Sequence, residues 1–146
     1  MPSLHLVIPA FNEARVIGTT LANLPRTFEG ITQTTIVVVD DGSSDDTAEV
    51  VMRCGDPRVV LLRHAINRGL GGALGTGLDY ARQHGADFVV TYDADGQHAP
   101  EDIVNGRAPR GEAKADAVIG SRLLDPKGMP WYRVIGNLGL PNSYWP

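Results

Sequence analysis

The feature that most constrains the fold is an unbroken run of strand-forming residues, Thr35-Ile36-Val37-Val38-Val39. Such continuous apolarity suits the central strand of a parallel sheet, because that strand is covered on both faces. Four other apolar runs predict further strands, and Pro9 should end the first of them, since proline cannot donate to a sheet ladder. These runs span residues 4–8, 59–62, 88–92 and 117–120.

Segments with helical periodicity separate these strands. Apolar residues that recur at spacings of three and four predict a helix before Pro25, and Ser43 and Ser44 are suited to cap the next one. The first expected helix covers 13–24, the second ends near Cys54, two more cover 70–84 and 100–105, and a weaker pattern covers 131–138.

The expected helix at 70–84 carries both an apolar stripe and several glycines. Glycine costs about 1 kcal/mol relative to alanine inside a helix. The glycines therefore indicate that another element or a ligand approaches this helix closely. The stripe is Leu70, Leu74, Leu78 and Ala81, and the glycines are Gly71, Gly72, Gly75 and Gly77.

The alternation of strands and helices with short connections predicts the α/β class, with an open, mostly parallel sheet and helices on both faces. In such sheets ligands bind at the carboxyl ends of the strands. Five polar segments fall at those ends and should converge on one edge. They are 9–13, 40–43, 67–69, 93–98 and 121–122.

Composition bounds the size and the partners of the protein. At 146 residues, with 42% hydrophobic residues, the chain is long enough for one core and too short for two ordinary domains. The net charge of −4 argues against a general nucleic-acid binder. A single cysteine excludes an intrachain disulfide, and no apolar run approaches the roughly 20 residues of a membrane span, so a cytoplasmic protein is expected.

The run at 88–92 is predicted to be a buried strand that ends in two carboxylates. Asp93 and Asp95 are two residues apart, so in an extended chain they point to the same side while Ala94 faces away. Carboxylates held so close repel each other unless a cation or a shared proton compensates their charge. The pair therefore favours a site for a hard divalent metal ion.

Five motifs occur in order along residues 4 to 138, and together they resemble the signature of a known family. They are Ile8-Pro9-Ala10-Phe11-Asn12-Glu13, Val39-Asp40-Asp41-Gly42-Ser43-Ser44-Asp45-Asp46-Thr47, Asn67-Arg68-Gly69-Leu70-Gly71, Asp93-Ala94-Asp95-Gly96-Gln97-His98 and Ile119-Gly120-Ser121-Arg122. The family is that of the family 2 glycosyltransferases, whose GT-A fold is a Rossmann-like sheet. The motifs look most like those of the dolichyl- or polyprenyl-phosphate mannosyl- and glucosyltransferases.

The resemblance implies that the chain binds a nucleoside-diphosphate sugar such as GDP-mannose or UDP-glucose. Pro9, Phe11 and Glu13 would line the base and ribose pocket, with Phe11 where the family often has tyrosine, and any aromatic face can stack on a base. Val38 and Asp40 match positions that contact the base and ribose. Taken alone, the segment at 40–43 has a less favoured alternative, a plain turn and helix cap.

The resemblance also implies a metal ion, Mg²⁺ or Mn²⁺. Asp93, Ala94 and Asp95 match the element that holds the metal and the diphosphate, and Gln97 matches a further metal-ligand position. The metal would offset the charge that grows on the leaving diphosphate, and oxygen ligands fit these ions rather than zinc. Arg122 matches an arginine near the phosphates, so Asp95 and Arg122 are the expected catalytic residues.

The acceptor that the resemblance implies is a polyprenyl or dolichyl phosphate. No convincing Asp or Glu follows Arg122 to act as a general base, and a lipid phosphate that is ionised at neutral pH needs none. In-line attack opposite the leaving diphosphate would invert the anomeric centre.

Two other functions are compatible with parts of the sequence. Family members continue beyond Gly139, so a nucleotide-sugar-binding domain at 1–139 with an irregular tail at 140–146 could be a truncated, non-catalytic fragment. The run at 90–96 also resembles the Asp-x-Asp-Gly strand of haloacid-dehalogenase-type phosphatases, although that motif belongs on a first strand.

Aromatic residues near the end suggest a homo-oligomer or peripheral contact with the cytoplasmic face of a membrane, unless the tail is disordered.

Overall fold

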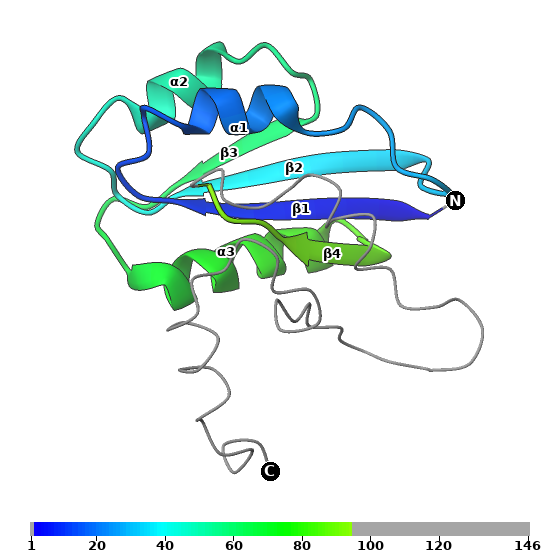
Figure 1. Ribbon diagram of the computed structural model, residues 1–146. Helices are drawn as coiled ribbons and strands as arrows, with labels where there is room; N and C mark the ends of the chain where they lie inside the picture. The colour runs from blue at the N-terminus through cyan, green and yellow to red at the C-terminus, as the bar shows by residue number, and fades with distance from the viewer. Residues whose placement is uncertain (1, 95–146) are drawn as a thin grey trace, which may run out of the picture. The chain divides into compact units, whose positions relative to one another are not determined.

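The computed structural model describes residues 2–94, which form a four-stranded parallel sheet between two layers of helices. The strands lie in the order β3-β2-β1-β4, with α1 and α2 over one face and α3 over the other (Figure 1). The predicted open parallel sheet is confirmed. The elements are β1 Ser3–Ala10, α1 Ile17–Asn23, β2 Gln33–Asp40, α2 Thr47–Arg53, β3 Val59–Arg63, α3 Gly69–Gln83 and β4 Phe88–Thr91.

The β2 strand is as deeply buried as its composition predicts. Ile36, Val37, Val38 and Val39 are all fully buried. Even-numbered residues of β1 and β2 pack with α1 and α2, whereas the odd-numbered ones pack with Ala73 of α3. Because side chains alternate across a strand, one continuous apolar run fills both layers of the core.

The prediction that Pro9 ends the first strand is wrong, because β1 continues to Ala10 and Pro9 is in register with Val39. The direction of the missing N–H explains the difference. The Val7 carbonyl accepts the Tyr92 N–H on the β4 side, and residues two apart in a strand point the same way, so Pro9 faces that side too. The register of β1 with β4 ends at Val7, so Pro9 forfeits no ladder bond within the described sheet.

The α1 helix begins four residues later than the predicted segment 13–24 and ends at Asn23. The N–H groups of Val16 and Ile17 both donate to the Glu13 carbonyl in the turns that precede it. The buried stripe predicted for this helix is confirmed. It comprises Ile17, Leu21 and Leu24.

The prediction that two serines cap α2 is wrong. The helix begins at Thr47, and its N-cap residue, Asp46, makes no side-chain capping bond. Ser43 and Ser44 bond instead to Asn12 in the loop after β1. These serines therefore join two loops rather than begin a helix.

The apolar stripe predicted for α3 is wrong in part. Of the stripe, Leu70 and Leu78 are 63% and 44% exposed, whereas Leu74 is half-buried and Ala81 is buried. Gly77 is buried as well. A Cβ built on Gly77 would stand 2.3 Å from Val7 Cγ1, so the helix lies on β1 at a distance that excludes large side chains. The prediction that the glycines mark a close approach is confirmed at this position.

The β4 strand is less buried than predicted. Phe88 and Val89 are 46% and 39% exposed. Within residues 2–94 this strand pairs only with β1, so it forms one edge of the described sheet.

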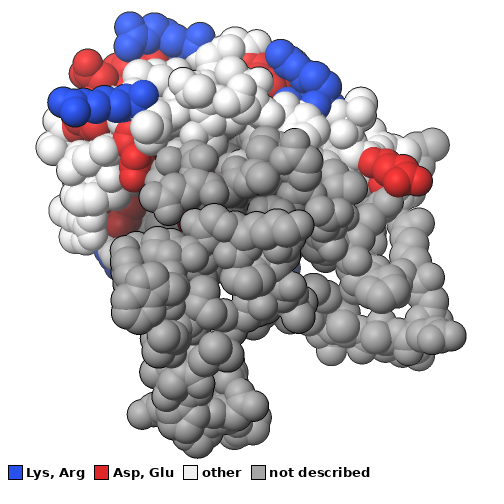
Figure 2. Space-filling model, in the orientation of Figure 1, with Lys and Arg blue, Asp and Glu red and all other residues white. Residues whose placement is uncertain are grey.

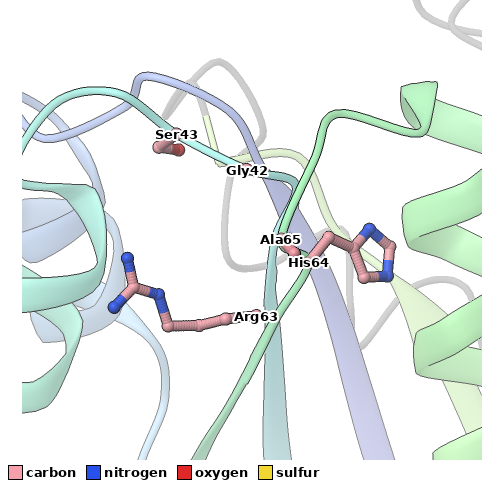
Figure 3. Close-up of a pocket in the computed structure, with 5 residues that line it drawn as sticks. All are labelled: Gly42, Ser43, Arg63, His64 and Ala65. Atoms are coloured by element: carbon pink, nitrogen blue, oxygen red, sulfur yellow. The ribbon is translucent and has the colours of Figure 1, made fainter.

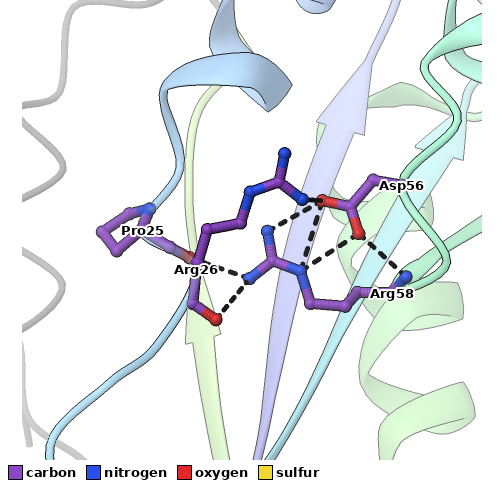
Figure 4. A network of polar contacts seen from close by, with 4 residues as sticks. All are labelled: Pro25, Arg26, Asp56 and Arg58. Carbon is purple, nitrogen blue, oxygen red and sulfur yellow. Dashed lines mark hydrogen bonds and ion pairs between the residues drawn. The ribbon is translucent and has the colours of Figure 1, made fainter.

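At the amino ends of the strands, Arg58 ties β3 to the segment after α1 (Figure 4). Its Nη2 donates to Asp56 Oδ2 at 2.8 Å, and its Nη1 donates to the Pro25 carbonyl at 2.8 Å. Arg26 adds a longer ion pair with Asp56 at 3.5 Å. On the face shown in Figure 2, basic and acidic side chains of the described residues lie next to each other, so their charges offset each other locally.

Several predictions fall outside the described residues, which all lie in the compact unit Met1–Asn105. These are the strand at 117–120, the helices at 100–105 and 131–138, and the domain end at residue 139 with its tail. In the described part of the chain, no helix combines the length and the apolarity needed to cross a bilayer.

Candidate functional site

Asn12 joins the loops that follow β1 and β2 at the carboxyl edge of the sheet. Its backbone N–H donates to Ser43 Oγ at 2.9 Å, and its side-chain Oδ1 accepts the Ser44 N–H at 2.9 Å. Asn12 has a φ of 56°, in the left-handed region that asparagine tolerates better than most residues. Asn12 thus ties the loop after β1 to the loop after β2.

A second set of bonds fixes the same two loops. The Glu13 N–H donates to Thr47 Oγ1 at 2.9 Å, and the Ala14 N–H donates to Asp45 Oδ2 at 3.1 Å. Asp45 Oδ1 in turn accepts bonds from the backbone and the hydroxyl of Thr47. The Thr47 hydroxyl is the largest cause that lowers the pKa of Asp45, so this carboxylate is ionised where it anchors the loop.

Asp40 is the last residue of β2 and is fully buried. Its Oδ1 accepts the Ser43 N–H at 3.0 Å, and its Oδ2 accepts a bond from Arg63 Nε at 3.2 Å. A buried carboxylate needs such partners, because an unpaired charge in the interior is costly. Both oxygens therefore serve the fold, and contact of Asp40 with a nucleotide stays a prediction.

Asp41 binds the loop between β3 and α3, which is the third loop at this edge. Its Oδ1 lies 2.6 Å from His64 Nδ1 and accepts the Arg68 N–H at 2.9 Å. The other ring nitrogen of His64 lies 2.9 Å from Thr76 Oγ1 of α3. Burial acts to raise the pKa of Asp41, but the bonds from His64 and from the Arg68 and Gly69 amides outweigh it and lower the pKa.

Gly42 allows the loops after β2 and β3 to touch. Its φ is +73°, and a Cβ built on it would stand 2.7 Å from both Asn67 N and Ile66 C. The backbones of the two loops are therefore packed directly against each other.

An open pocket lies beside this contact (Figure 3). Arg63 and His64 point to opposite sides of the β3 end in this view. Arg63 reaches Asp40, whereas His64 reaches Asp41 and α3. The pocket is lined by Gly42, Ser43, Arg63, His64 and Ala65.

The nucleotide-binding residues predicted from the first motif lie at the carboxyl end of β1 and in the loop that follows it. Phe11 is 46% exposed, and Pro9 and Glu13 are half-buried. Val38, by contrast, is enclosed in the core on the side of α1 and α2. The contacts of these residues with base and ribose stay predictions.

The two described residues of the predicted metal element lie beyond the end of β4 and differ in burial. Asp93 is exposed and Ala94 is buried. The Ala94 carbonyl accepts a bond from Thr20 Oγ1 at 2.9 Å, which ties this segment to α1. The first carboxylate of the pair is therefore on the side away from the core.

Of the predicted metal ligands and catalytic residues, the structure describes Asp93. Asp95, Gln97 and Arg122 lie outside the described residues. Within residues 2–94, no three His, Cys, Asp or Glu side chains are grouped so that they could hold a metal ion. The ligand set and the catalytic pair therefore stay predictions.

Asn12, His64 and Thr76 help to build this edge, although the sequence predicted no individual role for them. Asn12 stands within one of the five motifs and is a residue type that favours left-handed backbone, so its role had a signal. His64 and Thr76 are separated by 12 residues, one after a strand and one within a helix, and no local pattern marks their contact.

Comparison with known sequences gives a consistent family. The profile "Glycosyl transferase family 2" matches residues 5–142. "Uncharacterized protein MJ1222" of Methanocaldococcus jannaschii is 46% identical over 94% of this chain and 55% of that protein. A UDP-N-acetylglucosamine–dolichyl-phosphate N-acetylglucosaminyltransferase of Methanococcus voltae is 37% identical over 94% and 60%, respectively. A polyprenol monophosphomannose synthase of Mycolicibacterium smegmatis is 34% identical over 89% and 50%.

The chain thus spans about half the length of these curated relatives. Among solved structures, the mannosyltransferase PcManGT from Pyrobaculum calidifontis, in complex with GDP-Man and Mn²⁺, gives a TM-score of 0.58 at 29% identity. That likeness covers 72% of this chain and 31% of the mannosyltransferase. With a GT-A sheet and a family match that runs from residue 5 to residue 142, the chain belongs to glycosyltransferase family 2.

Proposed function

We propose that the protein is an inverting glycosyltransferase that moves a sugar of mannose or glucose type from a nucleoside-diphosphate donor to a polyprenyl or dolichyl phosphate. The observation that carries the proposal is the meeting of the loops after β1, β2 and β3 at the carboxyl edge of a family 2 sheet. Ligands of open α/β sheets bind at this edge. Relatives whose names specify dolichyl phosphate or polyprenol support the class of acceptor.

In this proposal the base of the donor lies against the loop after β1. The ring of the exposed Phe11 stacks on the base, and Pro9 and Glu13 line the base and ribose. The buried residues Val38 and Asp40 lie beneath them at the end of β2 and support this surface. An aromatic ring stacks on purines and pyrimidines alike, so the stacking favours neither GDP-mannose nor UDP-glucose.

The carboxylates after β4 hold Mg²⁺ or Mn²⁺ in this proposal. Asp93 is exposed after β4 while its neighbour Ala94 is buried, which suits a ligand role for the carboxylate. Asp95 and Gln97 complete an all-oxygen set that fits a hard divalent cation. When bound, the ion supplies charge neutralisation for the leaving diphosphate, and Arg122 adds a forked donor for phosphate oxygens.

The acceptor phosphate attacks without help from a general base. Its oxygen is ionised at neutral pH and forms a bond to the anomeric carbon as the bond from that carbon to the diphosphate breaks. Because the entering and leaving oxygens lie on opposite sides of the carbon, the product has inverted configuration.

Calorimetric titration with GDP, UDP, GDP-mannose and UDP-glucose, each with and without Mn²⁺, tests donor binding. We expect one nucleotide and its sugar derivative to bind in a metal-dependent manner. Transfer of radiolabelled sugar to a polyprenyl phosphate then tests catalysis. Binding without transfer would limit the function of the chain to binding a nucleotide sugar, and a lack of binding to all four ligands would reject the proposal.

A further inference from the structure

We propose that His64 is a positioning residue of the donor site. By binding Asp41 and Thr76 at the same time, it fixes the β3–α3 loop, residues 64–68, against the loop after β2. This role rests on the proposed function, because the site that the loop serves is the site for the nucleotide sugar.

Asp41 is the point at which the β3–α3 loop is held. The Asp41 side chain is only 5% exposed, and its Oδ1 meets the His64 ring at 2.6 Å and the Arg68 N–H at 2.9 Å. A buried carboxylate that loses a donor must find another donor, admit water or move. Removal of the His64 bond should therefore release the Arg68 amide along with the carboxylate.

His64 is itself fixed from the side of α3. Its ring is 7% exposed, and Nε2 lies 2.9 Å from Thr76 Oγ1. A threonine hydroxyl can donate or accept, so it can serve either tautomer of the ring. The next residue, Gly77, packs directly on Val7 of β1, so the ring is anchored to a part of the helix that the sheet holds in place.

The loop that His64 holds forms one wall of the carboxyl edge. Gly42 touches the loop backbone at Ile66 and Asn67, so a shift of the loop is transmitted to the loop after β2. A Cβ built on Gly72 would stand 2.7 Å from Arg68 Cβ, so the base of the Arg68 side chain lies against the first turn of α3 at Gly72. A moved loop would reshape this wall without altering any reacting group.

Two substitutions of His64 separate its two bonds. The amide of asparagine stands where Nδ1 stands in histidine, so His64→Asn keeps a donor for Asp41. The amide of glutamine reaches the place of Nε2, so His64→Gln keeps only the bond to Thr76. The full chain is tested for hydrogen exchange of the Arg68 amide by NMR and for affinity toward GDP and UDP with Mn²⁺ by calorimetry.

We expect His64→Gln to speed exchange of the Arg68 amide and to weaken nucleotide binding, each by about tenfold, whereas His64→Asn recovers both to within about threefold of the wild type. Thr76→Val is a milder variant that keeps the shape of the side chain and should weaken binding by about threefold. His84→Gln is the matched control, because His84 stacks on Tyr80 at 3.8 Å beyond the other end of α3 and should leave both measurements unchanged.

Equal losses in His64→Asn and His64→Gln would overturn the role assigned to the Asp41 bond. The Arg68 amide of His64→Gln could exchange rapidly while the variant binds nucleotide as tightly as the wild type does. That result would overturn the link between the loop and the donor site. A wild-type chain that binds neither nucleotide would reject the proposed function, and exchange of the Arg68 amide in His64→Gln would still decide whether His64 holds the loop.

Discussion

Gly77 of α3 lies so close to Val7 of β1 that a Cβ built on the glycine would stand 2.3 Å from Val7 Cγ1. The valine is fully buried in a strand that has neighbours on both sides, so it has little room to move away. We expect Gly77→Ala to lower the free energy of unfolding by about 1–3 kcal/mol, because the added methyl group pushes the helix away from the sheet. Urea denaturation followed by circular dichroism measures this change.

Gly75→Ala is the control in the same helix. Nothing lies within 4 Å of a Cβ built on Gly75. Alanine should therefore raise the free energy of unfolding by about 0.5–1 kcal/mol through its higher helix propensity. If both substitutions stabilise the chain, α3 does not pack on β1 as closely as the structure describes.

The Gly77 contact illustrates what the sequence could and could not predict about the fold. Strand-forming runs and helical spacings report local burial, so they located the elements and the class of sheet. They could not tell which members of the predicted α3 stripe are buried, because the exposed Leu70 and Leu78 satisfy helical periodicity as well as the buried Ala81 does. The burial of Gly77 depends on the distance between the helix and β1, which no local pattern reports.

At the carboxyl edge too, the sequence predicted some contacts and could not predict others. The rule that strand ends meet at one edge brought the loops of Asn12 and Asp41 together correctly. The contact of His64 with Thr76 depends on how the end of β3 meets the middle of α3, and no local sequence pattern reports it. Likewise, the place of Pro9 within β1 depends on which neighbour its missing N–H faces, and that is a property of the assembled sheet.

Gly42→Ala should lower the free energy of unfolding by more than the strain of a left-handed backbone alone. At a φ of +73° alanine is strained by about 1–2 kcal/mol. Its Cβ would also meet the backbone of Asn67 and Ile66 at 2.7 Å. We expect a total loss of about 3 kcal/mol in the free energy of unfolding, measured by urea denaturation.

Gly55→Ala separates the two contributions. Gly55 has a φ of +67°, but nothing lies within 4 Å of a Cβ built on it. This variant should lose only about 1–2 kcal/mol. Equal losses at both glycines would mean that the loops after β2 and β3 are not in contact.

Asp56 should make the stability of the chain depend on pH in strong acid. The side-chain bonds from Arg58 are the largest cause that lowers its pKa from 3.8 to about 2 (Figure 4). A carboxyl whose pKa is lower in the folded chain stabilises the fold fully above its unfolded pKa, and this stability is lost as the pH falls from about 3.8 to about 2. We expect Asp56→Asn to remove about 1–2 kcal/mol of the difference in unfolding free energy between about pH 5 and about pH 2.

Urea denaturation at the two pH values measures that difference. Asp79→Asn is the control, because Asp79 is 66% exposed and pairs with Arg82 at 3.5 Å on the surface of α3. This control should keep the pH dependence of the wild type. The same acid sensitivity in Asp56→Asn as in the wild type would contradict the network at Arg58.

His5 should make the chain less stable in mild acid. It is 4% exposed, and its Nδ1 has no hydrogen-bond partner among the described residues. Burial, and then the charge of nearby His84, lower the pKa of His5. The unfolded chain therefore takes up a proton that the folded chain does not, and the free energy of unfolding falls as the pH drops below about 6.5.

His5→Gln should weaken this dependence between about pH 7.5 and about pH 5.5 in urea titrations. His84→Gln should weaken it less, because the charge of His84 is the smaller of the two causes. An unchanged dependence in His5→Gln would assign the acid sensitivity to another group.

Asp95→Asn should abolish metal-dependent nucleotide binding while it leaves the fold intact. Under the proposed function the carboxylate of Asp95 shares a divalent ion with Asp93, and asparagine keeps the size of the side chain but removes its charge. Calorimetry should give binding of GDP or UDP that needs Mn²⁺ in the wild type and is at least about 100-fold weaker in the variant. Asp79→Asn, at an exposed position of α3, should bind as the wild type does. Equal affinity in Asp95→Asn and in the wild type would remove the metal ion from the end of β4, and the role assigned to Asp93 would fail with it.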